Sequence, residues 1–108
     1  EKKLYRNSGL KLRDLAETVN IPEYLVSQII NSGFKTNFYD LVNGFRIREA
    51  KGLLSLRSRE SSGILEIAYE VGFNSKSAFN NAFKRRTGKT PSQFRQLARG
   101  ESSFGTRI

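Results

Sequence analysis

Apolar residues recur along the chain at the spacing of an α-helix, in six separate stretches. The longest predicted helix covers residues 37–55 and is about five turns long. None of the stretches shows the sustained two-residue alternation of a strand, so the pattern predicts an all-α fold. The expected helices cover residues 12–19, 22–31, 37–55, 64–71, 75–86 and 91–99.

Several helix boundaries carry sequence signals of their own. Thr90-Pro91-Ser92-Gln93 combines a threonine N-cap, a proline at the first helical position and a glutamine three residues after the cap. Asn37 can cap the long helix, and Gly88 is suited to ending the helix before it. Gly44, by contrast, is a misfit inside the long helix that costs about 1 kcal/mol relative to alanine.

Two parts of the chain repeat one pattern of apolar residues. Residues 12–21 match residues 64–73 at an offset of 52 positions, and residues 26–30 match residues 79–83 at an offset of 53. Each copy predicts a short helix, a tight turn and a second short helix. This is the helix-turn-helix unit, whose second helix lies in a DNA major groove, although two hairpins of an ordinary helical bundle would give the same pattern.

The composition excludes several classes of function. The chain of 108 residues contains no cysteine, histidine, methionine or tryptophan. A disulfide, a thiol nucleophile, a zinc site and a histidine acid–base pair are therefore ruled out, and we predict no enzyme activity, no metal and no cofactor. The absence of a long apolar run and of a signal-peptide pattern argues against a membrane-spanning or secreted domain.

The charge distribution indicates a polyanionic partner. The chain has 19 Lys and Arg against 10 Asp and Glu, a net charge of +9. Residues 71–100 contain seven basic residues and no acidic residue. A basic stretch is often only a solvated face, but the complete absence of acids favours a binding surface. Together with the duplicated helix-turn-helix pattern, this stretch predicts binding to double-stranded DNA.

The second copy carries a specific set of residues: Ile67-Ala68-Tyr69-Glu70-Val71-Gly72-Phe73, Ser77, Phe79, Phe83-Lys84 and Thr87-Gly88-Lys89-Thr90-Pro91-Ser92-Gln93-Phe94-Arg95. The first copy and the long helix carry Leu15-Ala16, Ile29-Ile30, Phe38 and Arg46-Ile47-x-Glu49-Ala50-x-x-Leu53-Leu54. Together these residues resemble the signature of the AraC/XylS family of bacterial transcription regulators. The resemblance covers about residues 10–99.

The resemblance implies two homeodomain-like helix-turn-helix subdomains that read adjacent major-groove segments. It also implies a missing N-terminal sensor or dimerisation domain, RNA polymerase as a further partner, activation of transcription, and a location in the cytoplasm with the nucleoid, without excluding a membrane-tethered parent protein. The expected divisions are residues 1–36 for the first subdomain, 37–55 for the linker helix, 56–99 for the second subdomain and 100–108 for a disordered tail.

The sequence departs from the family pattern where helices begin and end. Lys11 and Gly63 stand at the usual capping positions of the first helix in each copy, and Pro22 replaces the usual Ser or Thr cap. Phe34-Lys35 replaces the Thr-Gly that normally ends the first recognition helix. Most of these changes affect the first copy.

Each recognition helix is expected to use an apolar face for packing and the opposite face for reading bases. The predicted packing stripes are Val26, Ile29 and Ile30 in the first and Phe79, Ala82 and Phe83 in the second. Asn and Gln can pair with adenine and Lys can donate to guanine, while an ordinary solvated side chain is the alternative at each position. The predicted base-reading residues are Tyr24, Ser27, Gln28, Asn31, Lys76, Ser77, Asn80 and Asn81.

A second group of polar residues is better suited to DNA phosphates, whose contacts set register and affinity. Ser75 and the first backbone amides of its helix could hold one phosphate. The predicted phosphate-binding residues are Ser75, Lys84, Arg85, Lys89 and Arg48. We interpret Phe73, Phe79, Phe83 and Phe94 as core residues, which weighs against a single-strand binder that stacks bases on aromatics.

Two alternative functions stay open on the sequence alone. One is a basic helical protein that binds RNA or the ribosome; the other is a structural bundle or an enzyme. Gly88-Lys89-Thr90 imitates the end of a phosphate-binding loop but lacks the preceding glycine and strand. The carboxylate pairs Asp14/Glu17 and Glu66/Glu70 are expected in first helical turns, where acids favour the helix dipole rather than catalysis.

Overall fold

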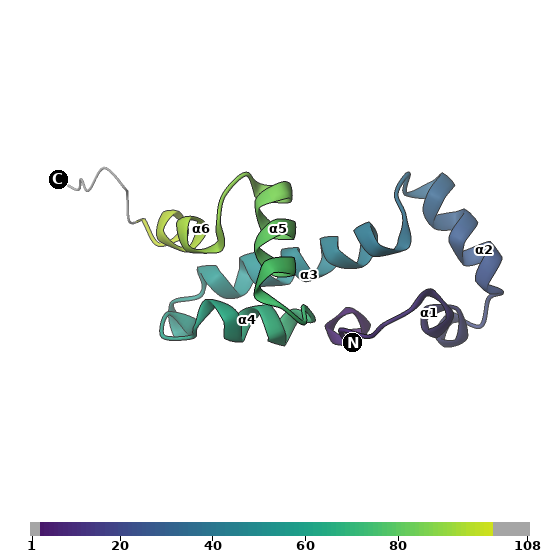
Figure 1. Ribbon diagram of the computed structural model, residues 1–108, viewed down its shortest axis with the longest axis horizontal. Helices are drawn as coiled ribbons and strands as arrows, with labels where there is room; N and C mark the ends of the chain where they lie inside the picture. Colours follow the sequence, from purple (N-terminus) through teal and green to yellow (C-terminus); the bar gives the residue numbers. More distant parts are fainter. Residues whose placement is uncertain (1–2, 101–108) are drawn as a thin grey trace.

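The computed structural model describes residues 3–100 and shows an elongated molecule of 56 × 24 × 24 Å (Figure 1). The described residues contain helices and no strand, which confirms the predicted all-α fold. The predicted tail at residues 100–108 lies outside the described residues except for Gly100. The α-helices are α1 (Leu12–Val19), α2 (Glu23–Gln28), α3 (Phe38–Ser55), α4 (Ile64–Val71), α5 (Lys76–Thr87) and α6 (Pro91–Ala98). Shorter elements are the 3-10 turns η1 (Leu4–Arg6) and η3 (Arg57–Arg59) and the π-helical turn η2 (Ile29–Gly33).

The predicted caps are present at three helix ends. Asn37 Oδ1 accepts from the backbone N–H of Asp40 at 2.8 Å at the start of α3. At α6 the capping box is closed, since the Gln93 N–H donates to Thr90 Oγ1 at 3.1 Å and the Thr90 N–H donates to Gln93 Oε1 at 2.9 Å. Gly88 ends α5 with a φ of +79°, a conformation that glycine adopts without steric cost.

The two unusual capping positions are supported by a carboxylate three residues later. The Lys11 N–H donates to Asp14 Oδ2 at 2.9 Å, and the Gly63 N–H donates to Glu66 Oε1 at 3.2 Å. Asp14 and Glu66 therefore stabilise helix starts. The expectation that both carboxylates of the pair Glu66/Glu70 lie in the first turn is wrong. Glu70 lies in the last turn of α4 and forms an ion pair with Arg59 at 2.5 Å.

The larger hydrophobic core lies where α4, α5 and α6 pack against the second half of α3; we call these elements the second unit. Phe79 and Phe83 are completely buried, and Phe73 is 4% exposed. Neighbouring rings along the row Phe73, Phe79, Phe83, Phe94 have centroids 5.3, 5.6 and 5.5 Å apart in tilted and edge-to-face arrangements. The prediction that these four phenylalanines form the core is confirmed.

A smaller core holds together α1, α2 and η2, which we call the first unit. Its buried residues are Ala16, Val26 and Ile30, and the first turn of α3 contributes Phe38 and Leu41 to its edge. The remaining partly buried members are Leu12, Leu15 and Ile21. Since so few side chains are fully removed from water, this core contributes much less stability than that of the second unit.

The prediction that Ile29 belongs to the packing stripe is wrong. Ile29 is 45% exposed, whereas its neighbour Ile30 is 3% exposed. The helix changes from α to π hydrogen bonding at Ile29, and only one of the two adjacent isoleucines faces the small core. Three apolar residues that recur at helical spacing in the predicted helices 12–19, 37–55 and 91–99 also stay at least 45% exposed: Val19, Phe45 and Leu97.

The long helix α3 joins the two units. Its first turn packs on the first unit through Phe38 and Leu41, and its second half packs into the second unit through Ile47, Ala50 and Leu54. Gly44 lies between these two regions, and a Cβ added there would have no heavy atom within 4 Å. The glycine therefore meets no steric need, and the helix is intrinsically weaker at this point.

Candidate DNA-binding surface

The second helix of the second unit, α5, is held firmly and presents its opposite face. Its apolar face is buried through Phe79 and Phe83, and Ser75 Oγ caps its start by accepting from the Ala78 N–H at 3.1 Å. The polar residues Ser77 and Asn81 lie on the exposed side. A rigid helix with a free polar face is the geometry by which a recognition helix enters a major groove.

The second helix of the first unit consists of α2 and η2 and extends to Gly33, two residues beyond the predicted end. Pro22 precedes it as N-cap residue with an extended conformation. Val26 and Ile30 turn inward, and the polar side is free apart from a long contact between Asn31 Nδ2 and Ser27 Oγ at 3.5 Å. After Gly33 the chain turns back through Lys35, which has a φ of +56°.

The structure leaves most predicted base-reading residues accessible. Tyr24 is 73% exposed, and the half-buried members are Ser27 and Asn80. The exposed members are Tyr24, Gln28, Asn31, Lys76, Ser77 and Asn81. The two recognition helices cross the long axis of the molecule in a similar direction and begin at the same edge (Figure 1). A body of 56 Å is long enough to present both to neighbouring major-groove segments, which are about 34–36 Å apart.

The predicted phosphate-binding residues divide into free and engaged side chains. Lys84, Arg85 and Arg48 are exposed, and Lys89 is half-buried beside Thr87, whose Oγ1 accepts from the Lys89 N–H at 3.1 Å. Ser75 Oγ already accepts the capping bond, but its hydroxyl proton can still be donated to an anion.

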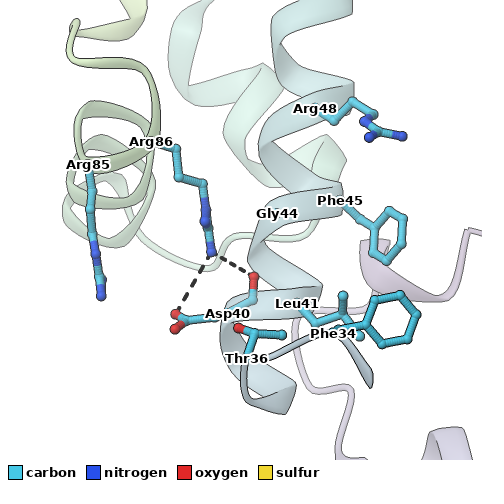
Figure 2. A pocket seen from close by; sticks show the side chains of 9 residues that line it. All are labelled: Phe34, Thr36, Asp40, Leu41, Gly44, Phe45, Arg48, Arg85 and Arg86. Carbon is cyan, nitrogen blue, oxygen red and sulfur yellow. Dashed lines mark hydrogen bonds and ion pairs between the residues drawn. The ribbon is translucent and has the colours of Figure 1, made fainter. Parts of the chain in front are cut away.

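An open groove lies between the two units, over the first half of α3 (Figure 2). It has a volume of about 450 Å³. Figure 2 shows Arg85 and Arg86 on one side of α3 and Arg48 and Phe45 on the other, with Gly44 between them. The guanidinium groups of Arg48 and Arg85 place positive charge beside this groove, on the two sides of α3.

Sequence reasoning missed the role of Arg86, which fastens α5 to α3. Its Nη2 donates to the backbone carbonyl of Asp40 at 2.6 Å and lies 3.8 Å from the Asp40 carboxylate. A signal for this role exists, because Arg86 follows Phe79 by seven residues and Phe83 by three and so lies on the packing side of the helix. Its guanidinium is therefore engaged by α3, although the residue itself stays exposed.

A family model described as a helix-turn-helix domain matches residues 15–97. The chain belongs to this family: it is an AraC-type helix-turn-helix DNA-binding domain, homologous to AraC-family transcriptional regulators, and not an enzyme. The resemblance expected from the sequence is thereby confirmed.

Named relatives and solved structures agree with this assignment. The chain is 38% identical over 92 residues to the transcriptional activator RhrA of Rhizobium meliloti (strain 1021), covering 85% of this chain and 29% of RhrA. It is 28% identical over 92 residues to the melibiose operon regulatory protein of Escherichia coli (strain K12), covering 85% and 30%. The chain thus spans about three tenths of the length of these relatives.

The fold matches the C-terminal domain of AraT, a response regulator from Geobacillus stearothermophilus. The TM-score is 0.76 at 30% identity, and the match covers 97% of this chain and 83% of that one. A DNA-binding transcriptional dual regulator from Escherichia coli K-12 matches at a TM-score of 0.75 and 19% identity, which supports the fold alone. In the part of the chain described here, no helix combines the length and the apolar character needed to cross a membrane.

Proposed function

We propose that this domain binds specific sites in double-stranded DNA, with the helix formed by α2 and η2 in one major-groove segment and α5 in the next. The observation that carries the proposal is the division of α5 into a completely buried apolar face and an exposed polar face. A polar face is normal for a surface helix, but here it carries amide and hydroxyl groups that can bond base edges, and the stretch around it has seven basic and no acidic residues, which favours a polyanion.

The proposed roles follow the geometry of each side chain. Exposed amides on the recognition faces suit base edges, whereas lysine and arginine at the end of α5 and on α3 suit phosphates. The proposed base-reading residues are Tyr24, Ser27, Gln28, Asn31, Lys76, Ser77, Asn80 and Asn81. The proposed phosphate-binding residues are Ser75, Lys84, Arg85, Lys89 and Arg48.

The proposal extends to the protein from which this domain comes. We propose residues 1–36 and 56–99 as the two DNA-binding subdomains, joined by the linker helix 37–55, with a sensor or dimerisation domain N-terminal to them. We propose that the whole protein activates transcription, which the name of RhrA, a transcriptional activator, supports, and that RNA polymerase is a further partner. DNA as the ligand implies a cytoplasmic location with the nucleoid.

Replacing Asn81 by alanine is expected to weaken binding to a cognate site by about 1–3 kcal/mol and binding to random duplex DNA by very little. The reason is that the amide loses its contacts to a base edge, while the phosphate contacts stay. The cognate site is obtained by selecting bound oligonucleotides from a random pool, and affinities are measured by fluorescence anisotropy. Gln96→Ala on α6, also an exposed amide, is the matched control and should change neither affinity.

Equal losses on cognate and random DNA would contradict a base-reading role for Asn81. The same measurement separates the proposed function from RNA binding. The selected duplex should displace the domain from a structured RNA at equal concentration, because base edges are readable in the major groove of DNA but not in that of A-form RNA. Stronger competition by the RNA would overturn the proposed function.

Replacing Lys84 by alanine is expected to weaken binding to all duplex DNA alike and to reduce the slope of log affinity against log salt by about one unit. One phosphate contact fewer releases one condensed counterion fewer. Arg57→Ala removes the same charge from the exposed turn η3 and should leave the slope unchanged. An unaltered slope in the Lys84 variant would refute the phosphate contact.

A further inference from the structure

The chain lies against the second unit before it forms the first. The turn η1 packs on α3 and α4, and the chain then runs to the start of α1 at Leu12. On the way the Leu10 N–H donates to the Asn7 carbonyl at 3.1 Å, and Leu10 is buried. We call residues 3–10 the N-terminal strap.

A buried arginine of α3 binds the backbone of the strap. Arg46 is only 9% exposed, and its guanidinium lies 5.7 Å from the ring centre of Phe73. Its Nε donates to the Tyr5 carbonyl at 2.6 Å, its Nη2 to the Asn7 carbonyl at 2.9 Å and its Nη1 to Asn43 Oδ1 at 3.0 Å. A buried charge is stable only where such bonds replace water, so Arg46 and the strap depend on each other.

The second unit has a recess that fits the strap. Gly72 follows α4 with a φ of +118°, and a Cβ added to it would lie 2.3 Å from the Tyr5 carbonyl oxygen and 2.7 Å from Arg46 Nε. The carbonyl that Arg46 binds thus occupies the space that a side chain would fill. Gly72 is needed both for the left-handed end of the helix and for this close approach.

Charged side chains fasten the outer edge of the strap. Glu49 on α3 accepts from Lys3 Nζ at 2.9 Å and from Arg6 Nε at 3.0 Å. Arg6 Nη2 also lies 3.7 Å from Glu70 of α4, which in turn pairs with Arg59 of η3. The Tyr5 ring stacks on Phe45 of α3 with centroids 5.9 Å apart and planes 15° apart.

The position of these contacts along α3 is significant. The strap contacts Phe45, Arg46 and Glu49, which lie in the first five residues after Gly44, the weak point of the helix. A glycine inside a helix weakens it by about 1 kcal/mol relative to alanine, so α3 resists bending less at Gly44. The strap therefore braces α3 beside the residue where a bend would change the angle between the two units.

The strap also links the first unit covalently to its anchoring point on the second unit. Arg6 is fastened to α3 and α4, and α1 begins only six residues later, at Leu12, a separation that cannot exceed about 20 Å. The first unit otherwise joins the rest through α3 and the edge of its own small core. With the strap in place, it is attached to the second unit at two points instead of one.

We propose that the N-terminal strap fixes the separation and angle between the two recognition helices, and so determines the spacing of the two DNA segments that the domain accepts. Arg46 is the positioning residue, acting through the strap and not on DNA. This inference rests on the proposed function, since it assumes that both helices bind one duplex.

The test varies the spacing within a selected binding site. Inserting or removing one base pair between the two contacted segments turns one segment relative to the other by about 35°. For the unaltered chain we expect each such change to weaken binding about tenfold or more, comparable to a mismatched base pair. For Arg46→Met and for Arg6→Gln we expect the same changes of spacing to lower the affinity by only about threefold or less. Arg57→Gln, an equal loss of charge away from the strap, should behave like the unaltered chain.

Three further measurements show whether a change in spacing preference comes from release of the strap. Hydrogen exchange of residues 3–10 should accelerate in both strap variants, and circular dichroism should show the native helix content. Affinity for a duplex containing only the segment bound by α5 should change less than about twofold. The Arg6 side chain is 36% exposed, so Arg6→Gln should fold even if Arg46→Met does not. The spacing preference can then still be measured in a strap variant.

A released strap with an unchanged spacing preference would overturn the inference. So would an equal loss of affinity for every spacing, because the strap would then act on stability alone. If the unaltered chain showed no site-selective binding to duplex DNA, the proposed function itself would fail, which is a distinct result.

Discussion

Replacing Phe79 by alanine is expected to lower the free energy of unfolding by about 3–5 kcal/mol. The ring is completely buried and packs against the rings of Phe73 and Phe83, at centroid distances of 5.3 and 5.6 Å. Removing it deletes a large apolar surface and leaves a cavity at the junction of α3, α4 and α5. Urea unfolding followed by circular dichroism measures the change.

The loss would be a large fraction of the total stability of a domain of this size, so DNA binding should fall with it. Phe34→Ala provides the matched control, because that ring is 63% exposed and its truncation should change the unfolding free energy by less than about 0.5 kcal/mol. Similar effects of the two substitutions would contradict the assignment of the core.

Acidification is expected to destabilise the domain through Glu49. The hydrogen bond from Arg6 is the main reason that the pKa of Glu49 falls from 4.5 to about 2, with Lys3 adding to the shift and burial opposing it. A carboxylate whose pKa is depressed by folding stabilises the folded state above the unfolded pKa. That contribution is therefore complete above about pH 5 and is lost as the pH falls from there to about 2.

The Glu49 contribution is at most about 3 kcal/mol, the free energy that corresponds to its pKa shift. Thermal unfolding as a function of pH should show a flatter acid limb in Glu49→Gln than in the unaltered chain. Some acid sensitivity should remain, because Arg59 also lowers the pKa of Glu70. Glu60→Gln, at an exposed position, is the control. An acid limb unaffected by Glu49→Gln would show that the strap ion pairs contribute nothing to folding.

Local signals in the sequence were sufficient for most of the fold. Periodicity and caps predicted the helices, and helical spacing identified Phe79 and Phe83 as core residues because one buried face is a property of a single helix. The same reasoning located the exposed polar face of α5. Which of these polar residues contact DNA stays a prediction.

The rest depended on contacts between residues far apart in the chain. Arg46 binds the backbone carbonyl groups of Tyr5 and Asn7. Because every residue has a backbone carbonyl, no sequence pattern indicates which one a side chain will bind. The two isoleucines at 29 and 30 were indistinguishable by spacing, and only the structure shows that Ile30 is buried while Ile29 is exposed. The sequence showed that Gly44 weakens the long helix. Only the structure shows that the N-terminal strap contacts the helix beside this residue.

The unequal cores have a consequence for how binding preference can diversify. The core of the second unit holds α5 from its buried side, so substitutions on the exposed face should change the proposed base contacts with little effect on folding. The first unit, with only three fully buried side chains, opens at a lower free energy and tolerates fewer changes. New target preferences should therefore arise more readily through α5 than through the first unit.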